Sequence, residues 1–248
     1  MFSADINCDL GEGLANDAGL MRYISSANIA CGYHAGDAAI MKKTVDLAIQ
    51  YELAIGAHPG FADKPGFGRK EMNLSLNEIF DLVSKQVFDL QEICLSRGSR
   101  LSHVKPHGAL YNMSARNEAM AQTIADAVFA ADAQLILFGL SGSFSIKAAA
   151  ARGLKTASEV FADRTYNDHG LLTARSEPNA MIETVEDSIQ QVLEMLQEGT
   201  VTSTGRKKIS IQADTICIHG DGKKAIVFAQ NIYEALQKNQ VTIKPLSF

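Results

Sequence analysis

Several short segments of the sequence place acids, imidazoles or a single lysine beside glycines. One of them, residues 28–37 (NIACGYHAGD), begins as an apolar run and then turns, with His34 on the turn and Asp37 at the position of a helix N-cap. A titratable ring on the loop after a strand is well placed for binding or catalysis. We predict that His34 and Asp37 bind substrate. The alternative is a glycine turn with a capping Asp and an incidental His.

The first apolar run ends in two carboxylates, Asp9 and Glu12, within the segment NCDLGEG (7–13). Such a pair could bind a hard cation, or its members could take opposite roles as acid and base once their pKa values separate. We predict that both are catalytic. An Asx-turn followed by an exposed Glu is the alternative.

The segment HVKPHGALYN (103–112) carries the most chemistry. Strand alternation places His103 and Lys105 on one face, with His107 just beyond. A buried lysine is costly unless it meets a carboxylate or a substrate anion. We therefore predict that Lys105 stabilises an oxyanion or phosphate and that His107 is a general acid or base, with His103 a packed, hydrogen-bonded residue. A structural Lys–Asp pair is the alternative for Lys105.

Two further segments follow the third apolar run, residues 53–57. HPG (58–60) supplies His58, and GFGR (66–69) has the composition of a mobile flap whose Arg69 could reach an anionic substrate group. We predict that Arg69 binds substrate. A long surface loop with a solvated arginine is the alternative.

The last two segments are EVFADRTY (159–166) and HGDG (219–222). We predict that Asp163, Arg164 and His219 bind substrate and that Asp221 caps a helix; ion pairing among the charged residues of 159–164 is the alternative. Lys224 stands where a P-loop needs Ser or Thr, so no Walker A motif is present. GLSGS (139–143) has free helix amides that suit a phosphate, but a plain turn is the stronger interpretation.

These segments sit between short apolar runs and amphipathic stretches that alternate along the chain. Ser75 and Glu78 form a capping-box pattern, and Gly98 and Gly153 follow two helical patterns as C-caps do. The alternation predicts parallel strands with helical crossovers. Strands are predicted at 4–8, 26–30, 53–57, 102–104, 134–138, 155–160 and 215–218, and helices at 38–51, 76–97, 117–131, 143–152, 180–198 and 223–239.

The distribution of the polar segments decides between the two architectures that seven parallel strands allow. A dinucleotide-binding sheet should carry GxGxxG after its first strand, and the sequence has none. An open sheet concentrates its site at one switch point, whereas a barrel gathers residues from many strand ends. We therefore predict an α/β fold, a (β/α) barrel, forming one domain over residues 1–248.

Composition narrows the partners and the compartment. The net charge of −5 argues against nucleic acid as the main partner. No apolar run approaches the roughly 18 residues of a membrane span, and Met1 leads straight into a strand pattern without a signal peptide. The four cysteines show no CxxC pairing. We expect reduced thiols and a cytoplasmic protein that contacts no membrane.

Six ordered motifs resemble those of the LamB/YcsF family. They are NCDLGEG, NIACGYHAGD, GAHPG with GFGR, KPHGALYN, EVFADRTY and ICIHGD, and they extend from Asp5 to about Asp221. The resemblance departs at 173–179, TARSEPN, where the family usually reads closer to VPRSQPGA. The role of that loop in binding is therefore open.

The resemblance implies a seven-stranded TIM-like barrel of the glycoside hydrolase/deacetylase group. It also implies the ATP-dependent 5-oxoprolinase reaction, in which 5-oxo-L-proline, ATP and water give L-glutamate, ADP and phosphate in a complex with subunits B and C. By the same resemblance Lys105 and Arg164 would hold phosphate or carboxylate oxygens, and Asp9 or His107 would activate water. The Asp/His/His metal site of related deacetylases would correspond to Asp9, His34 and His58, which implies a divalent cation.

Two other functions remain open on the sequence. One is a stand-alone metal-dependent amide or carbohydrate-ester hydrolase, which would not need ATP. The other is a non-catalytic protein that delivers the lactam to its partners, in which loss of His107 would leave turnover almost unchanged.

Overall fold

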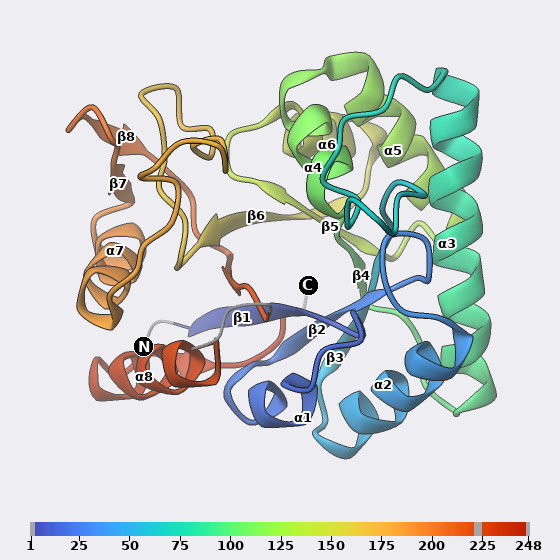
Figure 1. Cartoon of the computed structure of the whole chain (residues 1–248), viewed down its shortest axis with the longest axis horizontal. Coiled ribbons are helices and arrows are strands. Elements are labelled where there is room, and N and C mark those ends of the chain that lie inside the picture. Colours follow the sequence, from blue (N-terminus) through green and yellow to red (C-terminus); the bar gives the residue numbers. More distant parts are fainter. Residues whose placement is uncertain (1–2, 221–224, 247–248) are drawn as a thin grey trace.

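The computed structural model describes residues 3–220 and 225–246, and its centre is a barrel of parallel strands (Figure 1). Seven strands pair in the order β1-β2-β3-β4-β5-β6-β9, and pairing of β9 with β1 closes the barrel. The predicted seven-stranded barrel is confirmed. Its strands are β1 (Ser3–Leu10), β2 (Ser26–Ala30), β3 (Ala54–His58), β4 (His103–Val104), β5 (Ile136–Leu140), β6 (Lys155–Phe161) and β9 (Thr215–Ile218).

Helices surround the strands, as Figure 1 shows. Ser75 and Glu78 form the predicted capping box at the start of α3, and Gly153 ends α6 in the left-handed conformation. The helices are α1 (Asp17–Leu20), a 3₁₀ turn η1 (Met21–Tyr23), α2 (Ala38–Gln50), α3 (Leu76–Ser96), α4 (Gly108–Arg116), α5 (Glu118–Ala131), α6 (Phe144–Arg152), α7 (Val185–Gln197) and α8 (Ala225–Lys238).

Several elements differ from the sequence prediction. Helix α4 was not predicted, because it begins at a glycine, a residue that favours turns. Gly108 has a φ of +54°, in the left-handed region. The strand predicted at 134–138 begins two residues later, and α7 begins at Val185 rather than at 180. Short strands that carry too few residues to show a period were not predicted: the hairpin β7 (Thr200–Thr202) and β8 (Lys208–Ser210), and β10 (Thr242–Ile243) beside β1.

The alternation along β1 separates two environments. Ile6, Cys8 and Leu10 are buried in the apolar core that the strands share with the helices. Asp5 and Asp9 have the opposite parity, are also buried, and contact polar groups of neighbouring strands. The main apolar core therefore lies outside the barrel wall, and the barrel interior holds these polar groups together with a small apolar cluster of Ile136, Phe138 and Ala157.

Parallel pairing places the carboxyl ends of all seven strands at one end of the barrel. The loops after these strands carry the residues that the sequence singled out, so the fold brings them to one mouth. Within the described residues, no helix is both long and apolar enough to span a membrane.

Candidate functional site

The buried ammonium of Lys105 is the centre of what we name the Lys105 cluster, formed with Asn7, Asp9, Glu159 and Cys217. Its Nζ lies 2.8 Å from Asp9 Oδ1 and 2.8 Å from Glu159 Oε1. It also donates to Asn7 Oδ1 at 3.2 Å and to Cys217 Sγ at 3.0 Å. Side chains from β1, β6 and β9 thus converge on one positive charge that the loop after β4 supplies.

Burial and charge oppose each other in this cluster. Burial disfavours the ammonium, but the carboxylate of Asp9 and the other nearby acids raise the pKa of Lys105 well above its usual value. Burial also disfavours the Asp9 carboxylate, yet His58 and Lys105 lower the pKa of Asp9 well below its usual range. At neutral pH the pair is therefore ionised, which is the only way that a buried lysine and acid stabilise each other.

A second group, the histidine cluster, consists of Glu12, His34, His58 and His107, all buried. The rings of His34 and His107 stack with centroids 3.8 Å apart, and His58 stands edge-on to both. Glu12 Oε1 lies 3.6 Å from His34 Nε2 and 3.6 Å from His107 Nδ1. One ligand atom from each residue can be chosen so that all four lie within 4.8 Å of one another.

Backbone carbonyls determine which ring nitrogens carry protons. His58 Nδ1 lies 2.7 Å from the Lys105 carbonyl, and His107 Nε2 lies 2.9 Å from the Phe67 carbonyl. A carbonyl only accepts, so each of these nitrogens is a donor. In the neutral rings the other nitrogens, His58 Nε2 and His107 Nδ1, then both present lone pairs although they lie 2.8 Å apart. A cation, either a shared proton or a metal ion, relieves that repulsion.

His34 strengthens the case for a cation. Both of its ring nitrogens are buried and make no hydrogen bond. Burial and the neighbouring His58 lower the pKa of His34 to about 3, so the ring is neutral and able to act as a ligand. Glycine backbone holds the ring in place, because a Cβ at Gly60 would lie 2.6 Å from His34 Nδ1 and one at Gly68 would lie 2.7 Å from His34 Cβ.

The histidine cluster therefore could hold a metal ion, but with a different set of residues from the predicted one. His34 and His58 are members, as predicted, and Glu12 and His107 complete the set. Asp9 Oδ2 reaches His58 Nε2 at 3.3 Å while its other oxygen is bound to Lys105. Three imidazoles and a carboxylate suit Zn²⁺ or a similar first-row ion.

Asp9, Cys217 and His219 also have potential ligand atoms close together. The Lys105 ammonium already lies within 3.0 Å of Cys217 Sγ and 2.8 Å of Asp9 Oδ1. Burial and neighbouring charges raise the pKa of the Cys217 thiol well above its usual value, so it stays protonated. This second group fits the lysine rather than a metal.

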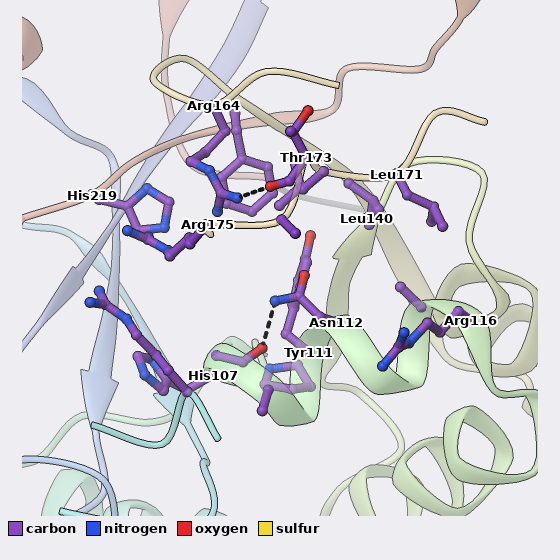
Figure 2. A pocket seen from close by; sticks show the side chains of 18 of the residues that line it. His107, Tyr111, Asn112, Arg116, Leu140, Arg164, Leu171, Thr173, Arg175 and His219 are labelled. Carbon is purple, nitrogen blue, oxygen red and sulfur yellow. Dashed lines mark hydrogen bonds between the residues drawn. The ribbon is translucent and has the colours of Figure 1, made fainter. Parts of the chain in front are cut away.

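A cavity of about 560 Å³ opens above both clusters. Asp9, His58, Lys105 and His107 line it from the barrel side. In Figure 2, His107 and His219 lie on one side of this pocket and Arg116 lies on the other. Further basic residues of its wall are Arg69, Arg164 and Arg175. The lining suits a small anionic molecule that reaches a buried acid–base floor.

Arg164 lines the pocket and also binds the loop at 173–179. Its guanidinium is buried and donates to the carbonyl of Thr173 at 2.6 Å (Figure 2). It also donates to the carbonyl of Ala180 at 3.2 Å. Burial lowers the pKa of Arg164 to about 10, which leaves it charged at neutral pH. Asp163 pairs with His219 Nδ1 at 2.9 Å. The acids of this segment thus contact residues outside it, Asp163 with His219 and Glu159 with Lys105.

Two of the predicted binding residues lie on the surface. Asp37 is exposed and accepts from the amides of Ala39 and Ile40, which makes it the N-cap of α2. Arg69 is exposed, lines the pocket and lies over the Phe67 ring. A binding role for either remains a prediction. Asp221, the predicted cap before α8, lies outside the described residues.

Several pocket and floor residues were not singled out as site residues from the sequence. Tyr111 is buried on α4 and lines the pocket, and Arg175 reaches it from the loop at 173–179. Asn28 contacts Asp9 from β2. Tyr111 and Asn28 lie inside the motifs quoted above, which was the available signal. The motif alone does not show which way such a side chain points.

The chain is similar over its whole length to proteins of known name. It is 50% identical over 248 residues to the A subunit of 5-oxoprolinase from Brevibacillus brevis, covering 98% of each chain. The A subunit of 5-oxoprolinase from Bacillus thuringiensis is 47% identical over 249 residues, again covering 98% of each. The crystal structure of a lactam utilization protein from Thermus thermophilus superposes with a TM-score of 0.93 at 37% identity, covering 99% of this chain and 100% of that one.

A family 4 carbohydrate esterase from Streptomyces lividans shares the fold with a TM-score of 0.54 at 10% identity, covering 100% of this chain and 95% of that one. The fold is thus a deacetylase-like (β/α) barrel, and the Lys105 cluster and the histidine cluster lie buried beneath its pocket. Residues 4–248 match the LamB/YcsF family, and the chain belongs to that family.

Proposed function

We propose that this chain is the A subunit of an ATP-dependent 5-oxoprolinase, which opens the lactam of 5-oxo-L-proline to L-glutamate in a complex with subunits B and C. The observation that carries the proposal is the 50% identity, over 98% of both chains, to a protein named as the A subunit of 5-oxoprolinase. The pocket agrees with it in character, since a small anionic substrate suits a basic wall above a buried Asp–Lys floor.

The proposed reaction needs an activated substrate. A five-membered lactam resists hydrolysis, and glutamate closes readily to form it. Transfer of the γ-phosphoryl group of ATP to the amide oxygen gives ADP and a phosphorylated lactam that water can attack. Attack by one water and cleavage of the C–N bond give γ-glutamyl phosphate, and a second water then releases phosphate and leaves glutamate. Because the sequence lacks a P-loop, ATP would be bound at the barrel mouth or at an interface with the partner subunits.

Asp9, Lys105 and His107, which line the bottom of the pocket, would have different roles in this reaction. Asp9 is ionised and lines the pocket, so it can take a proton from the attacking water. Lys105 keeps its charge beside Asp9 and can stabilise the oxyanion that forms on the lactam carbon. His107 also lines the pocket, and its neutral ring would either take a proton from water or join the ligands of a bound cation. Arg69 or Arg175 would hold the substrate carboxylate.

A divalent cation belongs to the proposal because the histidine cluster fits one. Glu12, His34, His58 and His107 would hold it, and when bound it would supply Lewis acidity toward an oxygen of the substrate or of water. Burial and the neighbouring rings of His58 and His34 keep the pKa of His107 well below its usual value, so its ring is neutral and available.

The decisive assay uses the chain purified with subunits B and C. We expect ATP hydrolysis that depends on 5-oxo-L-proline, with one glutamate formed for each ADP. Replacing an acid–base residue by His107→Ala should slow the reaction by about 10²–10⁴. The matched control is His169→Ala, which removes a histidine outside both clusters and should leave the rate unchanged.

Each alternative function predicts a different result in this assay. Ring opening without ATP would favour a stand-alone metal-dependent hydrolase, a function to which the histidine cluster gives its own support. Turnover of His107→Ala close to that of the unchanged protein would favour a delivery role. We also propose a cytoplasmic location, which agrees with the four unpaired, buried cysteines.

A further inference from the structure

A chain of hydrogen bonds inside the barrel ends on Asp9 and has no part in the roles described above. Asn28 Nδ2 lies 2.8 Å from Asp9 Oδ1. Behind it, His103 Nε2 lies 2.8 Å from Asn28 Oδ1. Ser102 Oγ lies 2.7 Å from His103 Nδ1 at the far end. His103 and Asn28 are each at most 1% exposed, so water does not compete for these bonds.

The donor and the acceptor of each hydrogen bond follow from the ionised Asp9 carboxylate at one end of the chain of bonds. The Asp9 carboxylate only accepts, so the Asn28 amide nitrogen must face it and the amide oxygen must face His103. That oxygen needs a donor, so His103 carries its proton on Nε2. His103 Nδ1 then accepts from the Ser102 hydroxyl at 2.7 Å, since the other acceptor near that hydroxyl, the Ile55 carbonyl at 3.1 Å, already accepts from the Ser102 amide. One tautomer and one amide orientation satisfy the whole chain.

Asn28 supports both members of the ion pair on the floor. Besides Asp9, its amide nitrogen donates to Asn7 Oδ1 at 2.7 Å. The same Asn7 oxygen accepts from Lys105 Nζ at 3.2 Å. Rotation of the Asn28 amide would therefore place an oxygen against two acceptors at once and displace the ion pair.

The His103 ring is held so that it cannot turn away. A Cβ at Gly56 would lie 2.1 Å from His103 Nε2, so only glycine leaves room for the ring on that side. On the other side the ring stacks on Phe138, with centroids 4.2 Å apart. Burial, with the charge of Lys105, lowers the pKa of His103 to about 3, and the ring therefore keeps a single proton at neutral pH.

We propose that His103 is a positioning residue: through Asn28 it fixes Asp9 Oδ1 against Lys105 and thereby directs Asp9 Oδ2 toward His58 and the pocket. His103 is neither among the residues that line the substrate pocket nor a member of the histidine cluster. The kinetic consequence rests on the proposed lactam-opening function, whereas the tautomer does not.

Two substitutions of similar polarity separate positioning from packing. In His103→Gln the amide nitrogen can take the place of Nε2 and keep the bond to Asn28. In His103→Asn the shorter side chain places its amide near Nδ1 and the bond is lost. With subunits B and C, we expect kcat of His103→Gln to stay within about threefold of the unchanged protein. His103→Asn should lose about tenfold to a hundredfold in kcat with little change in KM. Equal losses in both variants would overturn the proposal.

A second measurement does not depend on activity. In the protein labelled with ¹⁵N-histidine, long-range ¹H–¹⁵N spectra should show His103 as the neutral Nε2–H tautomer around neutral pH, with a slowly exchanging ring proton. The His103→Gln or His103→Asn spectrum identifies its signals. An Nδ1–H tautomer or a charged ring would overturn the proposal. Complexes that fail to open 5-oxo-L-proline while this tautomer is present would reject the function and leave the hydrogen-bond chain standing.

Discussion

The Lys105 cluster and the histidine cluster lie side by side beneath the same pocket, yet only one of them contains an ammonium. The Lys105 ammonium has two carboxylates at 2.8 Å and further acceptors in Asn7 and Cys217. In the histidine cluster, His58 Nε2 and His107 Nδ1 lie 2.8 Å apart, and His34 makes no hydrogen bond. The first cluster pairs its carboxylates with an ammonium of its own, whereas the second presents ligand atoms for a cation and contains no ammonium.

The difference separates what each cluster does for the fold. An ion pair that is fully buried must keep both partners, because removal of one leaves an uncompensated charge. A set of neutral ligands that face a common point contributes little to folding until its ion arrives, since binding energy then adds to stability. We therefore expect substitutions in the Lys105 cluster to act on the fold, and those in the histidine cluster to act on ion binding.

The largest expected effect is that of Lys105→Met. It leaves Asp9 and Glu159 buried without their cation, so the free energy of unfolding should fall by about 3–5 kcal/mol and activity should be lost. Urea denaturation measures the change. The control is Lys85→Met, which breaks an exposed pair with Asp89 on α3 and should leave stability almost unchanged. Similar losses in the two variants would remove the distinction between buried and exposed pairs.

Acidification should destabilise the metal-free protein next most strongly. The folded-state pKa of His34 and of His103 is about 3, below the unfolded value near 6.5. Below pH 6.5 the unfolded state therefore binds more protons, and stability falls as pH falls toward 3. Each ring should cost about 2 kcal/mol between about pH 7 and pH 5.

His107, whose pKa is also lowered, adds to this loss, while burial raises the pKa of Asp5, which opposes it above pH 3.8. Urea denaturation with a chelator present measures the balance at each pH. A stability that is flat over this range would mean that the histidines are protonated in the folded state, and the histidine cluster would then hold a proton rather than lack a cation.

His34→Leu tests the histidine cluster directly. The change removes two nitrogens that make no hydrogen bond and keeps a similar volume, so metal-free stability should change by less than about 1.5 kcal/mol. Affinity for Zn²⁺ should fall by at least about 100-fold in titration calorimetry, since outer-shell partners alone are worth about 10–100-fold. His169→Leu, outside both clusters, is the control. Zn²⁺ affinity equal to that of the unchanged protein would exclude His34 as a ligand.

Asp37→Ala should have the smallest effect and lies outside both clusters. Loss of the side-chain cap of α2 should cost about 1 kcal/mol and leave turnover unchanged. Ser75→Ala at the start of α3 removes an equivalent cap and is the matched comparison. If Asp37→Ala abolishes activity while the protein remains folded, Asp37 belongs to the site despite its exposure.

The elements and the barrel could be predicted because each rests on local pattern. Apolar runs that end in glycine and a polar residue indicated the barrel strands, and the capping pair Ser75 and Glu78 indicated the start of α3. Helix α4 and the β7–β8 hairpin were not predicted, since a helix that starts with glycine and strands of three residues carry no periodic signal.

Residue types and motif order determined by themselves that acids, imidazoles and Lys105 would meet at one mouth, because parallel strands leave no other arrangement of their carboxyl ends. Only the tertiary structure decided the partners. It assigned Asp9 to Lys105, placed Glu12 with three histidines, tied Arg164 to two carbonyls and left Asp37 on the surface. Which side chains become partners depends on small differences in distance between strands that are far apart in the sequence. The spacing of residues within one motif does not determine these distances.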